Sequence, residues 1–155
     1  MKMNFDIPCG YEFVCGIETH VEMKTNTKLF CSCENLSVKG KGPNTRCCPV
    51  CLGMSGTLPS LNKKAVEFAI IAGIALDCKI NQRSRMARKN YFYPDLTKGY
   101  QITQGAKPIA EHGRCELSDG RYVNIKRIHI EEDAGKIIYA KDKMLIDYNR
   151  SGVPL

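Results

Sequence analysis

The segment from Val14 to Glu22 alternates between apolar and polar positions, which is typical of a β-strand with one face toward a core. The face opposite the apolar side chains would carry Glu18, His20 and Glu22. Two carboxylates and one imidazole in a row can bind a divalent cation. The same row also fits a strand face in water, and on this segment alone that interpretation is the simpler one.

A second strand-like segment runs from Arg127 to Asp133 and ends in three consecutive carboxylates. Arg127, His129 and Glu131 would share one face. Adjacent carboxylates repel one another unless a cation or arginine side chains neutralise them. If the two segments are neighbours, four side chains could converge on one hard cation, and Mg²⁺ suits such ligands. These four are Glu18, His20, Glu131 and Glu132.

A helical period extends from Lys63 to Leu76, and Asn62 is the expected N-cap. Its apolar side chains occupy almost the whole circumference, so the helix is expected to be mostly buried.

Short strands are expected from Gln101 to Val123, with turns at residues 112–113 and 119–120. Residues 137–140 and 144–148 would form another hairpin. The whole pattern predicts an α+β fold: a mixed, mostly antiparallel sheet with one buried helix and a metal-binding knuckle.

The knuckle is predicted from four of the nine cysteines. Cys31 and Cys33 form one close pair, and Cys48 and Cys51 form a second pair after a short loop. Two such pairs can place four thiolates around a structural Zn²⁺, although the first is C-x-C, not the commoner C-x-x-C. Cys47 could replace Cys48, with poorer turn geometry. Buried or free thiols are the alternative, whereas an odd cysteine count without an export signal disfavours disulfides.

The segment from Arg83 to Gln104 interleaves basic residues with aromatic ones. Such a mixture can bind phosphates and stack on bases, as in nucleotide and single-stranded nucleic-acid sites. It also fits an ordinary loop whose aromatic side chains hold it to the core, and the pattern does not choose between the two.

Length and composition fit one ordinary globular domain, with 155 residues, 43% apolar and 25% charged. Residues 1–12 read as a loose leader and residues 13–155 as the domain. We find neither an apolar run of membrane-spanning length nor a signal peptide, so a cytoplasmic protein without a membrane partner is expected. The net charge of +7 favours an anionic partner, but the basic runs are shorter than in DNA-coating proteins, so DNA is not expected.

Several long motifs occur together in one order along the chain. They are Gly16-Ile-Glu-Thr-His-Val-Glu22, Cys31-Ser-Cys33, Cys48-Pro-Val-Cys-Leu-Gly53, Arg88-Lys-Asn-Tyr-Phe-Tyr-Pro-Asp95, Gly99-Tyr-Gln-Ile102 and Ile128-His-Ile-Glu-Glu-Asp-Ala-Gly-Lys136. Together they closely resemble the B subunit of the tRNA-dependent glutamyl/aspartyl amidotransferase (GatCAB). The resemblance runs from about Val14 to Leu155 and implies the first half of that subunit's catalytic (cradle) domain, truncated.

The resemblance implies an ATP- and Mg²⁺-dependent ligase that works with the A and C subunits in protein biosynthesis. ATP would phosphorylate the side-chain carboxylate of Glu-tRNA(Gln) or Asp-tRNA(Asn), and ammonia from glutamine would then displace the phosphate. The acidic group would be the catalytic Mg²⁺ site and the cysteines the zinc site. The nucleotide or the tRNA 3′ end would bind to Arg88, Lys89, Asn90, Tyr91 and Tyr93.

One departure from the family pattern is Met86-Ala87, where the family usually has an aromatic or apolar residue followed by Asp. Two other interpretations therefore stay open beside an enzyme part. The chain could be a truncated, non-catalytic zinc-bearing module that binds tRNA or a partner, or a product that folds poorly.

Overall fold

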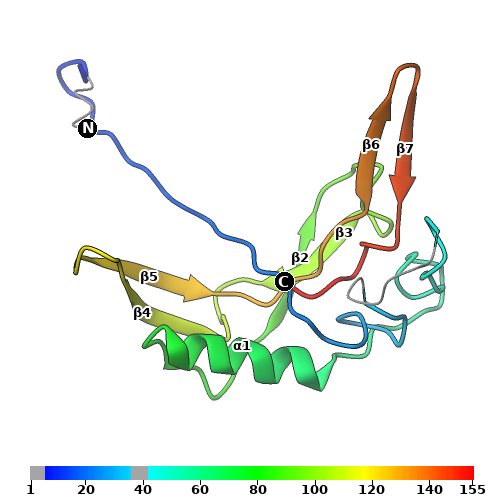
Figure 1. Ribbon diagram of the computed structural model, residues 1–155, viewed down its shortest axis with the longest axis horizontal. Helices are drawn as coiled ribbons and strands as arrows, with labels where there is room; N and C mark the ends of the chain where they lie inside the picture. The colour runs from blue at the N-terminus through cyan, green and yellow to red at the C-terminus, as the bar shows by residue number, and fades with distance from the viewer. Residues whose placement is uncertain (1–5, 36–41) are drawn as a thin grey trace.

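The computed structural model describes residues 6–35 and 42–155, and within them the chain forms one helix and seven strands (Figure 1). In chain order these are α1 (Lys63–Ala75), β1 (Lys79–Ile80), β2 (Met86–Asn90), β3 (Tyr100–Gln104), β4 (Ala110–Glu116), β5 (Tyr122–Ile128), β6 (Lys136–Ala140) and β7 (Lys143–Asp147).

The strands pair antiparallel in three small sheets: β1-β4-β5, β2-β3 and β6-β7. The predicted α+β class and the antiparallel pairing are confirmed, but the pairing is divided where one sheet was expected. Pro108 lies between β3 and β4, where a residue without a backbone N–H cannot extend a ladder.

Helix α1 packs on β1 and β4 through a stripe of small residues. Ala65 and Ala69 are buried, and a Cβ on Gly73 would come 2.7 Å from Ile80 Cδ1. The expected N-cap is confirmed, because Asn62 Oδ1 accepts from Lys64 N at 2.9 Å. The nearly all-round burial expected for this helix is wrong, since the described sheets cover only one of its sides and the other exposes apolar side chains. Those are Ile71 and Ile74.

The turn expected at His112-Gly113 is wrong, because both residues lie inside β4. The register is the same on both sides of His112, with Glu111 opposite Arg127 and Gly113 opposite Ile125, so no residue is inserted and His112 stays within the strand with a φ of 57°. Gly113 is needed there, since a Cβ would come 2.6 Å from the Leu76 carbonyl oxygen.

The other two turns behave as the sequence predicts. Gly120 has a φ of 79° at the tip of the β4–β5 hairpin, where Leu117 N donates to Arg121 O at 2.7 Å. The β6–β7 hairpin is also confirmed, with Ala140 opposite Lys143.

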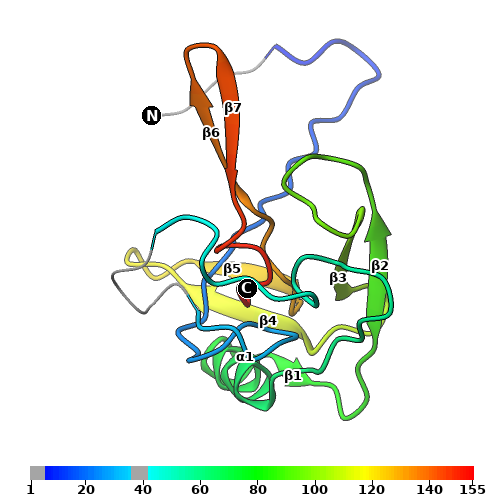
Figure 2. The same cartoon turned by 90° about the vertical axis from the view of Figure 1, so that its right-hand side faces the viewer.

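The strand expected at residues 14–22 is not formed. This segment is extended but runs away from the body of the molecule, as two perpendicular views show (Figures 1 and 2). Its apolar positions are as exposed as its polar ones, with Val14 83% and Ile17 89% exposed. Alternation buries one face only when a neighbouring strand or helix covers it, and no described segment does so here. Of the expected leader at 1–12, residues 1–5 lie outside the described residues.

The second acidic segment is only partly a strand, because β5 ends at Ile128. The acidic residues that follow β5 lie beside the last residues of the chain. Glu131 N donates to Leu155 O at 3.1 Å, and Asp133 N donates to Val153 O at 2.8 Å. Met23 N donates to Pro154 O at 2.9 Å, so the N-terminal segment joins the body close to the acidic residues.

Candidate functional site

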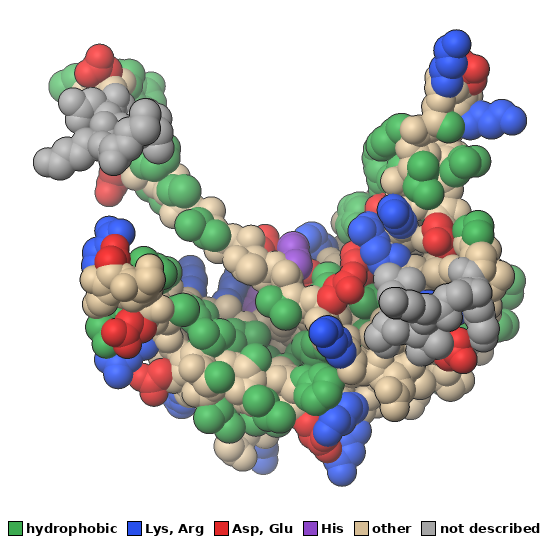
Figure 3. Space-filling model, viewed as in Figure 1, with side chains coloured by type: hydrophobic (Ala, Val, Ile, Leu, Met, Phe, Trp, Pro, Cys, Tyr) green, Lys and Arg blue, Asp and Glu red, His purple; other side chains and the backbone are tan. Residues whose placement is uncertain are grey.

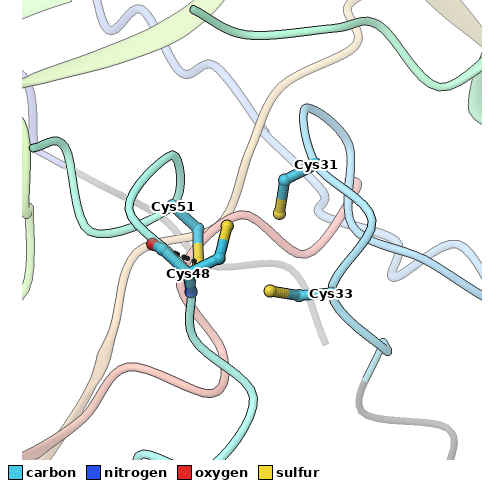
Figure 4. Close-up of side chains that lie close together, drawn as sticks. All are labelled: Cys31, Cys33, Cys48 and Cys51. Carbon is cyan, nitrogen blue, oxygen red and sulfur yellow. Dashed lines mark hydrogen bonds between the residues drawn. The ribbon is translucent and has the colours of Figure 1, made fainter. Parts of the chain in front are cut away.

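Four cysteines from two loops point their sulfur atoms toward one another (Figure 4). Cys31 and Cys33 lie in a turn that Lys28 N closes by donating to Cys33 O at 3.0 Å. Cys48 and Cys51 lie in a tight knuckle in which Cys48 N donates to Cys51 Sγ at 3.2 Å. The four sulfur atoms all lie within 4.8 Å of one another.

The electrostatics of this cluster favour a thiolate at Cys51 and disfavour thiolates at Cys31 and Cys33. The Cys31 thiol donates to Cys51, and this hydrogen bond lowers the pKa of Cys51 to about 4, helped by the backbone N–H of Cys48 and by Lys28. The same hydrogen bond raises the pKa of Cys31, together with burial. Burial, followed by the hydrogen bond with Cys48, raises the pKa of Cys33 to about 12. Four thiols at this spacing compete for protons, which a bound cation would displace.

The cluster fits a tetrahedral metal site. Metal–sulfur bonds of about 2.3 Å place sulfur atoms about 3.8 Å apart, so a small contraction of the observed cluster is enough. Cys47 does not belong to it: its Sγ lies 4.0 Å from Asn149 Oδ1, and burial raises its pKa. The four cysteines are therefore those that the spacing predicts, and they can hold a metal such as zinc.

The acidic site lies where the N-terminal segment joins the body. His20 Nε2 is 3.0 Å from Glu131 Oε1 and 3.9 Å from Glu18 Oε1. Glu131 is mostly buried, and its second oxygen accepts from Thr103 Oγ1 at 3.0 Å. Figure 3 shows histidine, acidic and basic side chains gathered at the base of the N-terminal segment. They lie on the face that is hollowed between this segment and the β6–β7 hairpin.

Glu132 points elsewhere. Lys98 Nζ donates to its Oε2 at 2.8 Å, and Ile102 N donates to its Oε1 at 3.0 Å. Successive side chains of an extended chain face opposite sides, so Glu131 and Glu132 enter different surroundings. The structure brings Glu18, His20 and Glu131 together and holds Glu132 apart from them, beside a cavity of about 90 Å³ that also borders Cys51.

The basic and aromatic residues form a hairpin, not an irregular loop. Arg88, Lys89 and Asn90 belong to β2, and the guanidinium of Arg88 stacks on the Tyr100 ring at 4.4 Å. The loop that follows β2 reaches the acidic site: burial raises the pKa of Tyr91, and the negative charges of Asp95, Asp133, Glu131 and Glu132 raise it further.

Tyr93 of the same loop contacts β6. Its hydroxyl forms a hydrogen bond with Tyr139 that raises the pKa of Tyr139. Of the expected phosphate- and base-binding residues, Arg88, Lys89 and Asn90 are all exposed to solvent on β2.

Two residues near this site were not among the site residues predicted from the sequence. Burial raises the pKa of Asp133. The guanidinium of Arg150, 3.4 Å away, opposes this rise, and the negative charge of Glu22 adds to it. His129 has an Nε2 that is buried with no hydrogen-bond partner among the described residues. Burial and Arg127 lower its pKa, against the charges of Glu131 and Glu18. Strict alternation from Glu131 would have indicated His129 and Asp133 in preference to Glu132.

The helix of the described residues, α1, has 13 residues and is too short to cross a bilayer.

Comparison with known proteins identifies the family. Residues 13–155 match the family model of the GatB/GatE catalytic domain. The chain is 54% identical over 149 residues to the B subunit of the aspartyl/glutamyl-tRNA(Asn/Gln) amidotransferase of Clostridium tetani, and 56% identical over 149 residues to that of Thermoanaerobacter pseudethanolicus. Each alignment covers 94% of this chain and 31% of the relative, so the chain spans about a third of their length. By this match over nearly all of its residues, the chain belongs to the GatB/GatE catalytic domain family.

Proposed function

We propose that this chain is part of a glutamyl/aspartyl-tRNA amidotransferase and supplies residues for the activation of a tRNA-bound carboxylate. The observation that carries the proposal is the group of Glu18, His20 and Glu131 beside the basic and aromatic β2–β3 hairpin. A hard cation and a polyphosphate need such neighbours, because oxygen and imidazole ligands hold the cation while arginine and lysine bind phosphate. The relatives' names give the tRNA-linked substrate, and at 54–56% identity the site residues can serve the same chemistry here.

In the proposed reaction, a side-chain carboxylate oxygen of Glu-tRNA(Gln) or Asp-tRNA(Asn) attacks the γ-phosphorus of ATP. The bond from that phosphorus to the bridging oxygen breaks, ADP leaves, and an acyl phosphate forms. Ammonia then attacks the acyl carbon, inorganic phosphate leaves, and the amide remains. The A subunit would release the ammonia from glutamine, and the C subunit would complete the assembly in the cytoplasm.

The residues of this chain would hold and orient the reactants. Glu18, His20 and Glu131 would hold Mg²⁺, which supplies charge neutralisation for phosphoryl transfer. Lys89, Asn90 and the Arg88–Tyr100 stack would contact the nucleotide or the 3′ end of the tRNA.

Glu132 has a different part in this proposal. With both carboxylate oxygens engaged by Lys98 and Ile102 N, it would fix β3 and the direction of its neighbour Glu131. Thr103 of the same strand donates to Glu131, so the position of β3 sets the position of the ligand oxygen. Zn²⁺ bound by the four cysteines would have a structural part, because four protein ligands leave no open position for a reactant.

A reconstituted complex tests the proposal. Residues 1–155 would be joined to the remaining two-thirds of the Clostridium tetani relative and combined with A and C subunits. Glu131→Gln and Glu18→Gln are expected to stop formation of ADP on Glu-tRNA(Gln) while glutamine hydrolysis continues. Glu116→Gln, at an exposed position of β4, is the matched control. Unchanged ADP formation in both variants would contradict the proposal and favour a zinc-bearing binding module.

A further inference from the structure

Lys28 is completely buried, at 0% exposure, which is unusual for a lysine. Its ammonium has two partners among the described residues: Cys51 Sγ at 3.6 Å and the Tyr148 carbonyl oxygen at 3.2 Å. No carboxylate in that part of the chain forms an ion pair with it. A buried cation requires a nearby negative charge, because transfer from water to a protein interior disfavours an unpaired ion strongly.

The four cysteines supply that charge. Zn²⁺ with four thiolates carries a net charge of −2, and at Cys51, the buried member of the cluster, this charge favours a nearby counter-ion. Lys28 lies on the Cys51 side of the cluster and can donate an N–H to the Cys51 sulfur. Such donors to a ligand atom, one step removed from the metal, fix the ligand's orientation and tune its affinity for the metal.

We propose that Lys28 is the charge-compensating residue of the cysteine metal site, a positioning residue that orients the Cys51 sulfur toward the metal and slows metal release. This inference rests on the zinc site of the proposed function. The Tyr148 carbonyl oxygen fixes the other side of the ammonium, so the chain beyond β7 holds the lysine in place. Lys28 thereby links three segments that are distant in sequence: its own turn, the Cys48–Cys51 knuckle and the end of the β6–β7 hairpin.

The first test compares Lys28→Met with Lys24→Met, an exposed lysine four residues away. Each purified chain is loaded with Zn²⁺ and challenged with a chromophoric chelator that reports transfer of the metal. Lys28→Met is expected to hold Zn²⁺ about 10- to 100-fold more weakly than the wild type, and Lys24→Met to match the wild type. Equal affinity of all three proteins would overturn the proposal, while loss of zinc from the wild type as well would instead refute the zinc site itself.

A merely structural lysine would not change the electronic properties of the site, so a spectroscopic measurement is included. In the Co²⁺-loaded proteins, the sulfur-to-metal charge-transfer band is expected at longer wavelength in Lys28→Met, because a thiolate without its N–H donor is a better electron donor. Lys28→Arg, which keeps the charge, is expected to restore part of both the band position and the affinity. An unshifted band in a folded Lys28→Met protein would overturn the proposal.

A measurement on the unaltered chain covers the case in which Lys28→Met does not fold. The wild type is loaded with ¹¹³Cd²⁺ and examined for scalar coupling between the metal and lysine ammonium protons. The proposed N–H donor to a metal-bound sulfur is expected to give one such correlation, retained in Lys24→Met. Absence of any correlation with a lysine in the fully loaded protein would overturn the proposal.

Discussion

Lys98 and Glu132 form an ion pair that is almost completely buried, with Nζ 2.8 Å from each of the two carboxylate oxygens. The pair lies beside the cavity that separates it from the cysteine cluster, and Gly53 of the knuckle packs closely on Lys98. A Cβ on Gly53 would come 2.6 Å from Lys98 Cγ. Thr97, next to Lys98, donates to the Cys51 carbonyl oxygen at 2.8 Å. The Cys48–Cys51 knuckle and the acidic residues 131–133 are therefore connected through Thr97 and Lys98, which follow the aromatic loop.

Removing one member of this pair is expected to destabilise the fold strongly. Lys98→Met leaves the buried Glu132 carboxylate with only the Ile102 N–H as a partner among the described residues, and the free energy of unfolding should fall by about 3–5 kcal/mol. The matched control is Asp119→Asn, which breaks the exposed pair with Arg121 and should cost about 1 kcal/mol or less. Urea unfolding measures both. Equal, small changes in the two variants would show that Lys98 and Glu132 are not paired in the interior.

Magnesium is expected to stabilise the chain through Glu131. A ligand that binds only the native state increases the free energy of unfolding, by about 2.7 kcal/mol when the ligand concentration is 100 times Kd. A melting series at millimolar Mg²⁺, with and without ATP, should therefore raise the Tm of the wild type. Glu131→Gln and Glu18→Gln should abolish the shift, and Glu116→Gln should keep it. A wild-type Tm that does not respond to Mg²⁺ would argue against metal binding by these residues in this chain.

Zinc is expected to bind at one equivalent per chain. Cys48→Ser removes one of the four converging ligands and should release the metal and lower the Tm, because the binding free energy of a structural zinc contributes to folding. Cys47→Ser is the matched control, since its sulfur lies toward Asn149 and not toward the cluster. Metal analysis of anaerobically purified protein, followed by thermal melting, measures both effects. Similar zinc loss in the two variants would contradict the assignment of the ligands.

Gly113→Ala tests the close approach of β4 to the end of α1. The new methyl group would clash with Cys78 Sγ and come 2.6 Å from the Leu76 carbonyl oxygen, so the backbone must move. Overpacking of this kind is expected to cost about 1–3 kcal/mol or more. Gly16→Ala is the control, because nothing lies within 4 Å of the added Cβ in the exposed N-terminal segment. Denaturant unfolding should separate the two, and a silent Gly113→Ala would contradict the close packing of β4 on the end of α1.

Local patterns specified the parts of the fold that depend on neighbouring residues. Asn62 caps α1 because its side chain meets an N–H two residues later. The Asp119-Gly120 turn forms because glycine adopts a positive φ without strain. The cysteine spacing likewise predicted two short turns, each of which holds its own pair of sulfur atoms. These features need few contacts beyond the segment itself.

Burial was harder to predict, because it depends on what covers a segment. The alternation at residues 14–22 predicts a strand, yet Val14 and Ile17 face solvent in the described structure. Helix α1 has apolar side chains around it, but only Ala65, Ala69 and Gly73 of this described helix are fully buried. A periodic pattern specifies which side chains lie on one face, whereas the presence of a covering element is a property of the whole assembly.

The sequence by itself determined the family, the helix, the β4–β5 and β6–β7 hairpins, and which four cysteines converge. Only the tertiary structure decided that Glu131 contacts His20 while its neighbour Glu132 is neutralised by Lys98, 34 residues away. It also decided that Lys28 lies against Cys51, 23 residues away. The physical reason is that charged side chains act through space: their partners are set by the path of the backbone between them, and sequence spacing does not record that path.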